Sequence, residues 1–503
     1  MIVFVNPRVT RPKNRRFPLS VMAVGAALPP DVPWAIVDGN CPGTDTFGEI
    51  AAHIESRKGT RDPVRAVGMT VMPGPQLVAA VGLARRVKER FPHVPVVWGG
   101  YFPSLYPTPV VSADYVDWAV RGQGEETFVE LLNVLDGRRD PRTVAGLAFQ
   151  DDGAIWIGPE RPWLGPDQLP PPPYDRIDVE EYIHPTVLGR RSAVYQASIG
   201  CPFGCKFCGV ISVFGRREMV ESPARTMDRL SYLVDRHGVD SVHFYDSNFF
   251  LGEDHAVEFC SRLTDLSISW WCESRIDAML RFSDRTWRLI KESGLKMVFF
   301  GAESGSNEVL RKMDKRLTTE QTLEVAAKTR EYGIIPEFSF VLGGPEDPEG
   351  EIEKTLAFVR KLKTVNPSME LITYFYTPTP QRGSTYGDVD PLSGTPATLE
   401  GWIQPEWVRW MTHEDPRVPW MNDRLRARVE NFELVLKSRF PSVHDTKTAR
   451  WGKALAKALA VRPWRSGRYE NTGLLRAVGK LARVPEPDAQ AYGHLRQPPA
   501  DLP

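Results

Sequence analysis

Three cysteines within eight residues constrain this chain more than any other feature. Cys201, Cys205 and Cys208 lie in the stretch SIGCPFGCKFC with the spacing C-x3-C-x2-C, and they are half of the six cysteines in the chain. Thiolates are the usual ligands of iron–sulfur clusters, so three of them this close together can hold three irons of a [4Fe–4S] cubane. The fourth iron then lacks a protein ligand. An open position of that kind is kept by catalytic sites and closed in structural ones.

Other interpretations of the three cysteines are weaker. A structural zinc site needs four ligands in paired spacings, and the sequence offers no second C-x2-C or H-x3-H pair. A disulfide framework is unusual in a chain of 503 residues with six cysteines. Three packing thiols gathered by chance remain an alternative, which the flanking Gly-Cys-Pro and Gly-Cys-Lys-Phe disfavour.

With these flanks, the stretch resembles the signature of the radical S-adenosylmethionine (SAM) superfamily. The resemblance implies that Cys201, Cys205 and Cys208 are the catalytic metal ligands of a [4Fe–4S] cluster. It also implies that the reduced cluster passes an electron to SAM, which releases a 5′-deoxyadenosyl radical that takes hydrogen from the substrate. An electron donor such as flavodoxin or ferredoxin would then be a partner.

Formal charge balances over the chain, with 63 basic and 63 acidic residues. This balance leaves no overall electrostatic footprint for nucleic acid, so we expect no such partner. Residues Met1–Pro7 lack the regions of a signal peptide and are typical of a core strand. No apolar run reaches the length of a membrane span. We therefore expect a cytoplasmic protein without a transmembrane segment, in a reducing setting that keeps thiolates free.

In the first 140 residues, short apolar runs alternate with helical patterns. This alternation predicts an α/β, doubly wound (Rossmann-like) parallel sheet, whose ligands bind at the carboxyl ends of the strands. The expected strands are 2–5, 34–37, 66–71, 94–98 and 115–120, and the expected helices are 19–28, 47–56, 76–90 and 126–135.

The loops after these strands resemble those of the cobalamin-binding domain of class B radical SAM enzymes. The matching segments are Phe17-Pro18-Leu19, Val37-Asp38, Trp98–Pro103 and Val120–Glu125. The resemblance implies a set of cobalamin-binding residues: Thr70, Met72, Gly99, Gly100, Tyr101, Pro103, Gly122 and Glu125.

Two departures and one alternative accompany this resemblance. The loop 6–12 contains no histidine, so no histidine from it is a lower ligand of cobalamin. Gln123 stands where this domain commonly has glutamate. The alternative is a degenerate sheet that is kept only for packing.

Residues 141–190 are expected to form a linker. It includes a hairpin signal at Asp151-Asp152-Gly153 and four consecutive prolines, Pro170–Pro173, that cannot continue a helix or a central strand. Residues 191–395 resume the alternation in six strand–helix units, fewer than a closed barrel requires. They suit the partial (β/α)6 barrel typical of radical SAM enzymes. The expected strands are 193–198, 241–245, 269–274, 297–300, 335–342 and 371–377.

Polar residues on or after these apolar strands are candidates for SAM binding, because burying them unpaired is costly. SAM carries an ammonium and a carboxylate, which call for a carboxylate and a guanidinium. By resemblance, the SAM-binding residues are Phe207, Asp246, Ser247, Arg275, Glu303 and Ser304. Residues 381–386 are a near match for the Pro-x-Pro-Gly-Thr-like turn of related enzymes. Cys41, Cys260 and Cys272 are expected to be packing thiols.

The last segment, residues 396–503, is expected to be helical and to cover the barrel mouth and the substrate. Amphipathic helices are predicted near 424–438 and 448–460, and a loosely ordered end beyond Arg462. The basic helix around Lys447–Arg465 has two interpretations, a solvated face or a contact with an acidic lipid surface.

Three hypotheses about activity remain open. The resemblance favours a methyltransferase, in which one SAM methylates cobalamin and a second SAM is cleaved at the cluster. The methyl group then passes from methylcobalamin to an unactivated carbon or phosphorus of a secondary metabolite or lipid. The second hypothesis is radical cyclisation or rearrangement with the same cofactors, and the motifs do not separate it from the first. The third is a non-enzymatic metal protein. A tRNA methylthiotransferase is disfavoured, because its N-terminal domain carries three cluster cysteines and this one has only Cys41.

Overall fold

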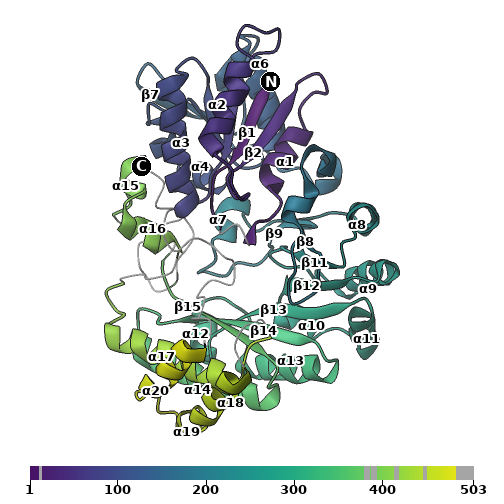
Figure 1. Ribbon diagram of the computed structural model, residues 1–503, viewed down its shortest axis with the longest axis vertical. Helices are drawn as coiled ribbons and strands as arrows, with labels where there is room; N and C mark the ends of the chain where they lie inside the picture. The colour runs from purple at the N-terminus through teal and green to yellow at the C-terminus, as the bar shows by residue number, and fades with distance from the viewer. Residues whose placement is uncertain are drawn as a thin grey trace.

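The computed structural model describes residues 1–10, 14–378, 386, 394–412, 418–443, 445 and 450–482. Two sheets lie one above the other in Figure 1, and the connector between them runs along one side. The 381–386 turn lies outside the described residues except for Tyr386. No helix in the described ranges combines the length and apolar character that crossing a bilayer requires.

The upper sheet has seven strands in the order β2-β1-β3-β4-β5-β6-β7. The pairs among β1 to β5 are parallel. Helices cover both faces, which confirms the doubly wound prediction. In β1, Val3 and Val5 pack under the helices of one face, and Ile2 and Phe4 pack under those of the other, because side chains alternate along a strand. The strands are β1 (Ile2–Asn6), β2 (Trp34–Asp38), β3 (Ala66–Thr70), β4 (Val96–Gly99), β5 (Trp118–Val120), β6 (Leu147–Asp151) and β7 (Ala154–Ile157).

The helices on this sheet agree with the sequence pattern to within a few residues. They are α1 (Leu19–Ala26) and α6 (Gly124–Leu135) on one face, and α2 (Thr46–Ser56) and α3 (Pro75–Arg90) on the other. The predicted hairpin around Asp152 forms as β6 and β7. It continues the upper sheet, since β6 pairs antiparallel with β5. The first structural unit therefore extends past residue 140, to at least Ile157.

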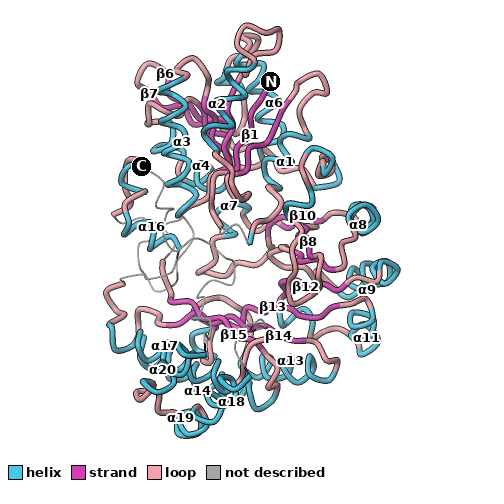
Figure 2. Tube along the Cα trace, in the orientation of Figure 1, coloured by secondary structure: helices cyan, strands magenta, loops and turns pink. Residues whose placement is uncertain are grey.

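The lower sheet has six parallel strands in chain order, β8-β11-β12-β13-β14-β15. No pairing closes β15 onto β8 in the described part of the chain, so the partial (β/α)6 barrel is confirmed. The strands are magenta in Figure 2. They are β8 (Ser192–Tyr195), β11 (Ser241–Phe244), β12 (Ser269–Ser274), β13 (Leu295–Glu303), β14 (Ile335–Leu342) and β15 (Glu370–Phe375).

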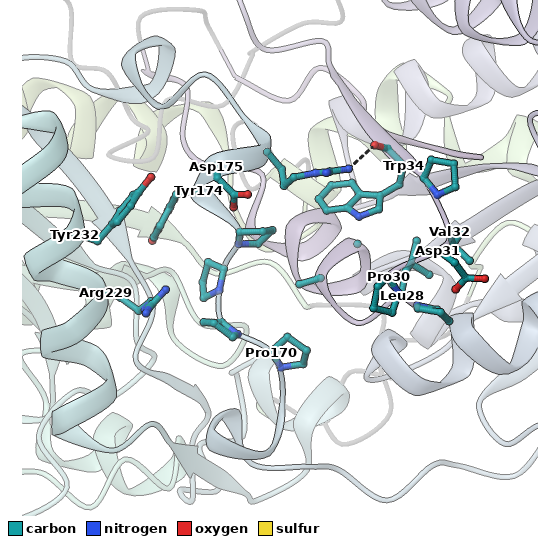
Figure 3. Close-up of a pocket in the computed structure, with 18 of the residues that line it drawn as sticks. Leu28, Pro30, Asp31, Val32, Trp34, Pro170, Tyr174, Asp175, Arg229 and Tyr232 are labelled. Carbon is teal, nitrogen blue, oxygen red and sulfur yellow. Dashed lines mark hydrogen bonds between the residues drawn. The ribbon is translucent and has the colours of Figure 1, made fainter. Parts of the chain in front are cut away.

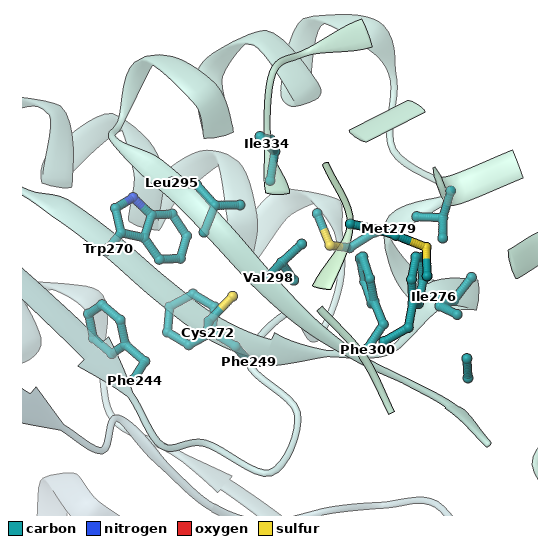
Figure 4. Packing of buried hydrophobic residues seen from close by; sticks show 14 of the residues in the cluster. Phe244, Phe249, Trp270, Cys272, Ile276, Met279, Leu295, Val298, Phe300 and Ile334 are labelled. Carbon is teal, nitrogen blue, oxygen red and sulfur yellow. The ribbon is translucent and has the colours of Figure 1, made fainter. Parts of the chain in front are cut away.

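Alternation along these strands separates the core from the barrel interior. Phe244, Cys272, Val298 and Phe300 face the helices and form the core shown in Figure 4. Cys272 and Cys260 are fully buried, as expected of packing thiols. The covering helices are α8 (Pro223–His237), α9 (Glu253–Leu263), α11 (Asp284–Glu292), α13 (Thr319–Glu331) and α14 (Pro348–Val365).

The C-terminal helices divide between the two units. Helix α15 (Leu399–Trp402) joins the core of the upper sheet, and α16 (Pro405–Thr412) follows it. Helix α17 (Asp423–Arg439) lies on α14 through ion pairs Arg424–Glu349 and Arg428–Glu353 at 2.6 and 2.7 Å. Between α16 and α17, Trp420 donates to the carbonyl of Gly343, which follows the carboxyl end of β14, so this turn of the predicted cover reaches the barrel mouth.

The prediction of a loosely ordered end beyond Arg462 was wrong for residues up to 482. Helices α18 (Arg450–Leu459), α19 (Val461–Ser466) and α20 (Gly473–Ala482) follow one another. Glycine 467 ends α19 with a φ of 69°, a left-handed cap that β-carbons disfavour. Leu475 and Val478 then bury one face of α20. The helices form because leucine and alanine recur at helical spacing, although the segment is also rich in basic residues and glycine.

Candidate active site

The three cysteines lie on the loop between β9 (Ser198–Gly200) and α7 (Val210–Phe214), at the carboxyl end of the lower sheet. Gly200 begins the loop with a φ of 85°, and a β-carbon there would come within 2.3 Å of the Arg217 carbonyl. Cys205 is buried, and Cys201 and Cys208 are half-buried. Burial raises the pKa of Cys201 and raises that of Cys208 to about 11. A bound metal must therefore supply the driving force for deprotonation.

Two cations lie beside Cys205. The guanidinium of Arg275, the residue after β12, lies 3.8 Å from the Cys205 Sγ and 3.7 Å from the centre of the Phe203 ring. It donates to Asp277 at 2.8 Å and to the carbonyl of Lys315 at 2.8 Å, so its position is fixed from three sides. The Lys315 ammonium is also buried nearby. Lys315 was not among the predicted site residues, because it lies in a polar loop with no strand periodicity to mark it.

These residues fit an iron–sulfur cluster. No three His, Cys, Asp or Glu side chains in the described ranges converge on a single metal ion. A cubane needs a different arrangement, because each thiolate binds a different iron. The loop offers three thiols outside any disulfide. Positive charge beside Cys205 suits the negative charge that thiolates and sulfides give such a cluster.

Two acids lie near the cysteine loop: Asp246, which follows the carboxyl end of β11 and is buried, and Glu218, which begins β10 (Glu218–Val220) and is half-buried. Asp246 is 1% exposed, accepts a hydrogen bond from the Ala197 amide at 3.3 Å, and has its pKa raised to about 7 by burial. Asn248 donates to Glu218 at 3.3 Å, and burial raises the pKa of Glu218 to about 7 as well. Ser247, between them, is half-buried. Glu218 is a further candidate site residue, which the sequence did not indicate because its neighbours are polar and typical of an exposed segment.

Glu303 ends β13 with a φ of 61°, and its carboxylate accepts from Lys315 at 2.7 Å. Ser304 is buried, and its hydroxyl accepts from the amide of Ser306 at 3.1 Å, which is a turn contact. The ring of Phe207 lies 5.9 Å from the Lys315 ammonium. Phe207, Arg275 and Glu303 are therefore gathered around one buried lysine.

A cavity of about 360 Å³ opens at the carboxyl edge of the upper sheet. It runs between α1 and α6 down to Gly68 in β3, and its other wall comes from the flanks of the cysteine loop, including Ile199 and Phe214. Six of the predicted cobalamin-binding residues line it: Thr70, Gly99, Gly100, Tyr101, Gly122 and Glu125. Met72 and Pro103 do not line it. Met72 is 43% exposed, and Pro103 is buried within α4 (Tyr101–Leu105).

The glycines of this cavity have two roles. At the rim, a β-carbon on Gly99 or Gly122 would meet no atom closer than 3.7 Å, so a ligand can approach the backbone there. At Gly68 and Gly100, the absence of a side chain makes room for the protein's own atoms. A β-carbon on Gly68 would lie 3.1 Å from the Phe4 ring, and one on Gly100 would lie 3.0 Å from the Thr70 hydroxyl oxygen. Gly100 also has a φ of 95°, which side chains disfavour. The part of the cavity between α1 and α6, called the slot below, is lined mostly by apolar side chains, and the rim carries glycines. Such a lining suits a large macrocycle with an aromatic tail. The residues present therefore fit cobalamin.

Gln123 and Tyr101 connect this cavity to the rest of the chain. The Gln123 amide accepts from the backbone N–H of Leu164 at 2.7 Å and donates to the Leu164 carbonyl at 3.1 Å. A glutamate carboxylate could not donate the hydrogen bond to the Leu164 carbonyl, which explains why glutamine stands here in place of the glutamate common in this domain. The Tyr101 hydroxyl donates at 3.3 Å to the carbonyl of Gly209, the residue after Cys208. The rim of the upper cavity thus contacts the cysteine loop directly.

A second hollow, an outer cleft of about 760 Å³, lies on the far side of the proline run. Figure 3 shows Trp34, Tyr174 and Tyr232 around it, with Arg176 donating to the Trp34 carbonyl at 3.1 Å. Pro170 and Pro172 line both hollows. The predicted connector is therefore also the wall that separates the inner cavity from the surface.

Comparisons with known proteins match both halves of this site. The model of the B12 binding domain matches residues 19–132, and that of the Radical SAM superfamily matches residues 195–359. A protein named as an uncharacterised methyltransferase in Pyrococcus horikoshii is 31% identical over 323 residues, which are 63% of this chain and 67% of that protein. The chain belongs to the cobalamin-dependent radical SAM enzymes.

Two further proteins share less of their sequence with this chain. The anaerobic magnesium-protoporphyrin IX monomethyl ester cyclase of Rubrivivax gelatinosus is 28% identical, over 62% of this chain and 56% of its own length. The fold resembles the solved structure of the radical SAM methyltransferase TsrM from Kitasatospora setae with cobalamin and a [4Fe–4S] cluster bound. The TM-score is 0.63 at 16% identity, with 96% of this chain and 99% of that chain covered. As a radical SAM enzyme with a B12 binding domain, this chain uses a [4Fe–4S] cluster, SAM and cobalamin.

Proposed function

We propose that this radical SAM enzyme is a cobalamin-dependent methyltransferase, and that it methylates an unactivated carbon or phosphorus of a secondary metabolite or lipid. The observation that carries the proposal is the shared cavity. Strand ends of the upper sheet and flanks of the cysteine loop line one space, and Tyr101 joins its two sides. A methyl donor held by one domain and a substrate activated in the other must meet in such a space. The name of the Pyrococcus horikoshii relative supports this proposal.

The proposed roles of the residues follow from their contacts. Cys201, Cys205 and Cys208 would hold the cluster, and Arg275 and Lys315 would balance its charge. Asp246 would accept a hydrogen bond from the SAM ammonium, and Phe207 would contact its adenine. When bound, the cofactors supply one-electron chemistry and the methyl group, while the protein supplies position and a dry site. Pro170 and Pro172, which line the cavity, would help to exclude water from it.

Counting the products of SAM tests the reaction. Methyl transfer yields S-adenosylhomocysteine together with 5′-deoxyadenosine, and the two should appear with substrate turnover in an anaerobic assay of the reconstituted enzyme. Turnover that yields 5′-deoxyadenosine alone would contradict methyl transfer.

The alternative is radical cyclisation or rearrangement with the same cofactors. The similarity to the cyclase of Rubrivivax gelatinosus, at 28% identity, supports this alternative. The product count separates the two reactions, because a cyclase leaves no S-adenosylhomocysteine. Either reaction needs an electron donor, for which we propose flavodoxin or ferredoxin in a reducing cytoplasm, where free thiols persist.

Replacing a cluster cysteine tests the site itself. Cys205→Ala should abolish 5′-deoxyadenosine formation and lower the iron content, because three thiolates are needed to hold the cubane. Cys260→Ala is the matched control, since this thiol is fully buried within α9, and it should keep both. Turnover that persists in Cys205→Ala would contradict the assignment.

A further inference from the structure

Helices α18 and α20 present apolar side chains to solvent. Their four large ones are the most exposed in the described part of the chain: Trp451 at 58%, Leu455 at 44%, Leu474 at 63% and Leu481 at 75%. The two helices pack against each other. They lie at the end of the molecule opposite the upper sheet, with α19 beside them (Figure 1).

Each helix carries two separate apolar stripes. On α18, Gly452 and Ala456 are buried, while Trp451 and Leu455 lie one turn apart on an exposed stripe. On α20, Leu475 and Val478 are buried, while Leu474 and Leu481 are exposed. At 3.6 residues per turn, Leu474 and Leu481 fall on one side of their helix. The buried stripes account for packing against the protein, so the outer stripes have no structural role within the described chain.

The same segment is strongly basic, although the whole chain is neutral. Residues 450–482 contain eight lysines and arginines and a single acidic residue, Glu470. Glu470 is already paired with Arg428 at 3.0 Å. Lys457 on α18 and Lys480 on α20 are exposed and have no ion pair among the described residues. Lys480 lies about 100 to 120° around its helix from the exposed apolar stripe, and Lys457 lies about 120 to 160° from that of α18.

We infer that α18 and α20 dock the enzyme on an anionic lipid bilayer. An interfacial helix needs an outward apolar stripe to enter the acyl boundary and lysines or arginines beside it to meet the headgroups. Both helices have this arrangement. A nucleic acid would use the cations but would gain nothing from exposed leucines. A second copy of the chain would bring an equally basic surface and be repelled. The inference does not depend on the reaction that the enzyme catalyses.

Vesicle flotation of the full chain tests the inference. We expect binding to phosphatidylcholine vesicles that contain phosphatidylglycerol, none to pure phosphatidylcholine, and weaker binding as salt rises. Lys457→Glu with Lys480→Glu should lower the partition constant by at least about fivefold per position. Leu474→Ser with Leu481→Ser should also lower it, with every charge retained. All four side chains are exposed, so melting temperatures should not change.

Lys58→Glu with Arg61→Glu is the matched control, because both residues are exposed and belong to the upper domain. It should leave the partition constant unchanged. Several results would overturn the inference: no binding by the natural chain, binding that survives both helix pairs, equal loss in the control pair, or equally tight binding to duplex DNA. Loss of binding on deletion of 483–503 alone would also overturn it, by moving the site off the two helices.

Discussion

At the scale of single residues, the chemistry of the site depends on a buried ion pair. Lys315 and Glu303 are 11% and 7% exposed and 2.7 Å apart. Burial acts to lower the pKa of Lys315, but Glu303 and Cys205 outweigh it and leave that pKa raised. Gly301 makes the pair possible, because a β-carbon there would lie 2.2 Å from Glu303 and 2.7 Å from Lys315. Each charge is tolerated only because the other is present.

Lys315→Met should therefore destabilise the fold by about 3–5 kcal/mol, since it leaves the Glu303 carboxylate buried and uncompensated. Adding Glu303→Gln should recover most of that loss, because both charges are then gone. Urea unfolding of the two variants measures the difference. Equal stability of the single and double variants would show that the pair does not act as one unit.

SAM binding should depend on pH through Asp246. Its pKa is raised to about 7, so the carboxyl is protonated below that pH and cannot pair with the SAM ammonium. Affinity for SAM should fall by up to about tenfold for each pH unit below 7, as expected for one linked proton. Calorimetric titration at pH 6, 7 and 8 measures it. Asp246→Asn should bind weakly with a flat profile, and a slope that survives this change would assign the effect to Glu218 instead.

At the scale of elements, β3 and its neighbours hold open the slot of the upper cavity. Gly68 lies on the floor of the slot between Phe4 and Phe128, and α1 and α6 form its sides. An open slot leaves side chains without contacts on one side, which costs packing energy. A ligand that fills the slot would restore those contacts. The gap therefore indicates a binding role, not a packing role, for this sheet.

Gly68→Leu should fill the slot and weaken cobalamin binding by about tenfold or more, through the cost of overpacking. Absorbance titration with cobalamin measures the change without any turnover. Gly82→Leu on α3 is the control, because a β-carbon there has nothing within 4 Å. The Gly82→Leu variant should bind cobalamin normally. An unchanged affinity for cobalamin in Gly68→Leu would show that the aromatic tail of cobalamin does not enter the slot.

At the scale of the whole molecule, the C-terminal segment returns to complete the N-terminal domain. Trp402 is 1% exposed, and its ring centre lies 4.5 Å from that of Tyr106 and 5.4 Å from that of Phe102. Glu400 accepts from Arg85 at 2.6 Å and from Tyr115 at 2.8 Å. The upper domain thus depends on residues three hundred positions away in sequence.

Trp402→Ala should destabilise the upper domain by about 3–5 kcal/mol, as expected when a large buried ring is removed. Trp451→Ala, which removes a ring that is 58% exposed, should change stability by no more than about 0.5 kcal/mol. Chemical denaturation, followed by the rate at which a protease cleaves the N-terminal domain, compares the stability of the two variants. Similar losses in both variants would contradict this account of the core.

The sequence by itself determined the cysteine loop, the two alternating α/β units and six residues of the upper cavity. The loop and the two units follow from local signals, the spacing of the cysteines and the periodicity of strands and helices, and the six cavity residues follow from the resemblance of their loops to a cobalamin-binding domain. Only the tertiary structure decided that Lys315 pairs with Glu303, that Gln123 makes two hydrogen bonds to Leu164, and that Trp402 completes a distant core. The physical reason is that periodicity reports which side of an element is buried, while contacts between remote segments depend on how the elements are placed in space. Met72 and Pro103 lie on the loops that the sequence indicated, but one faces solvent and the other lies inside a helix.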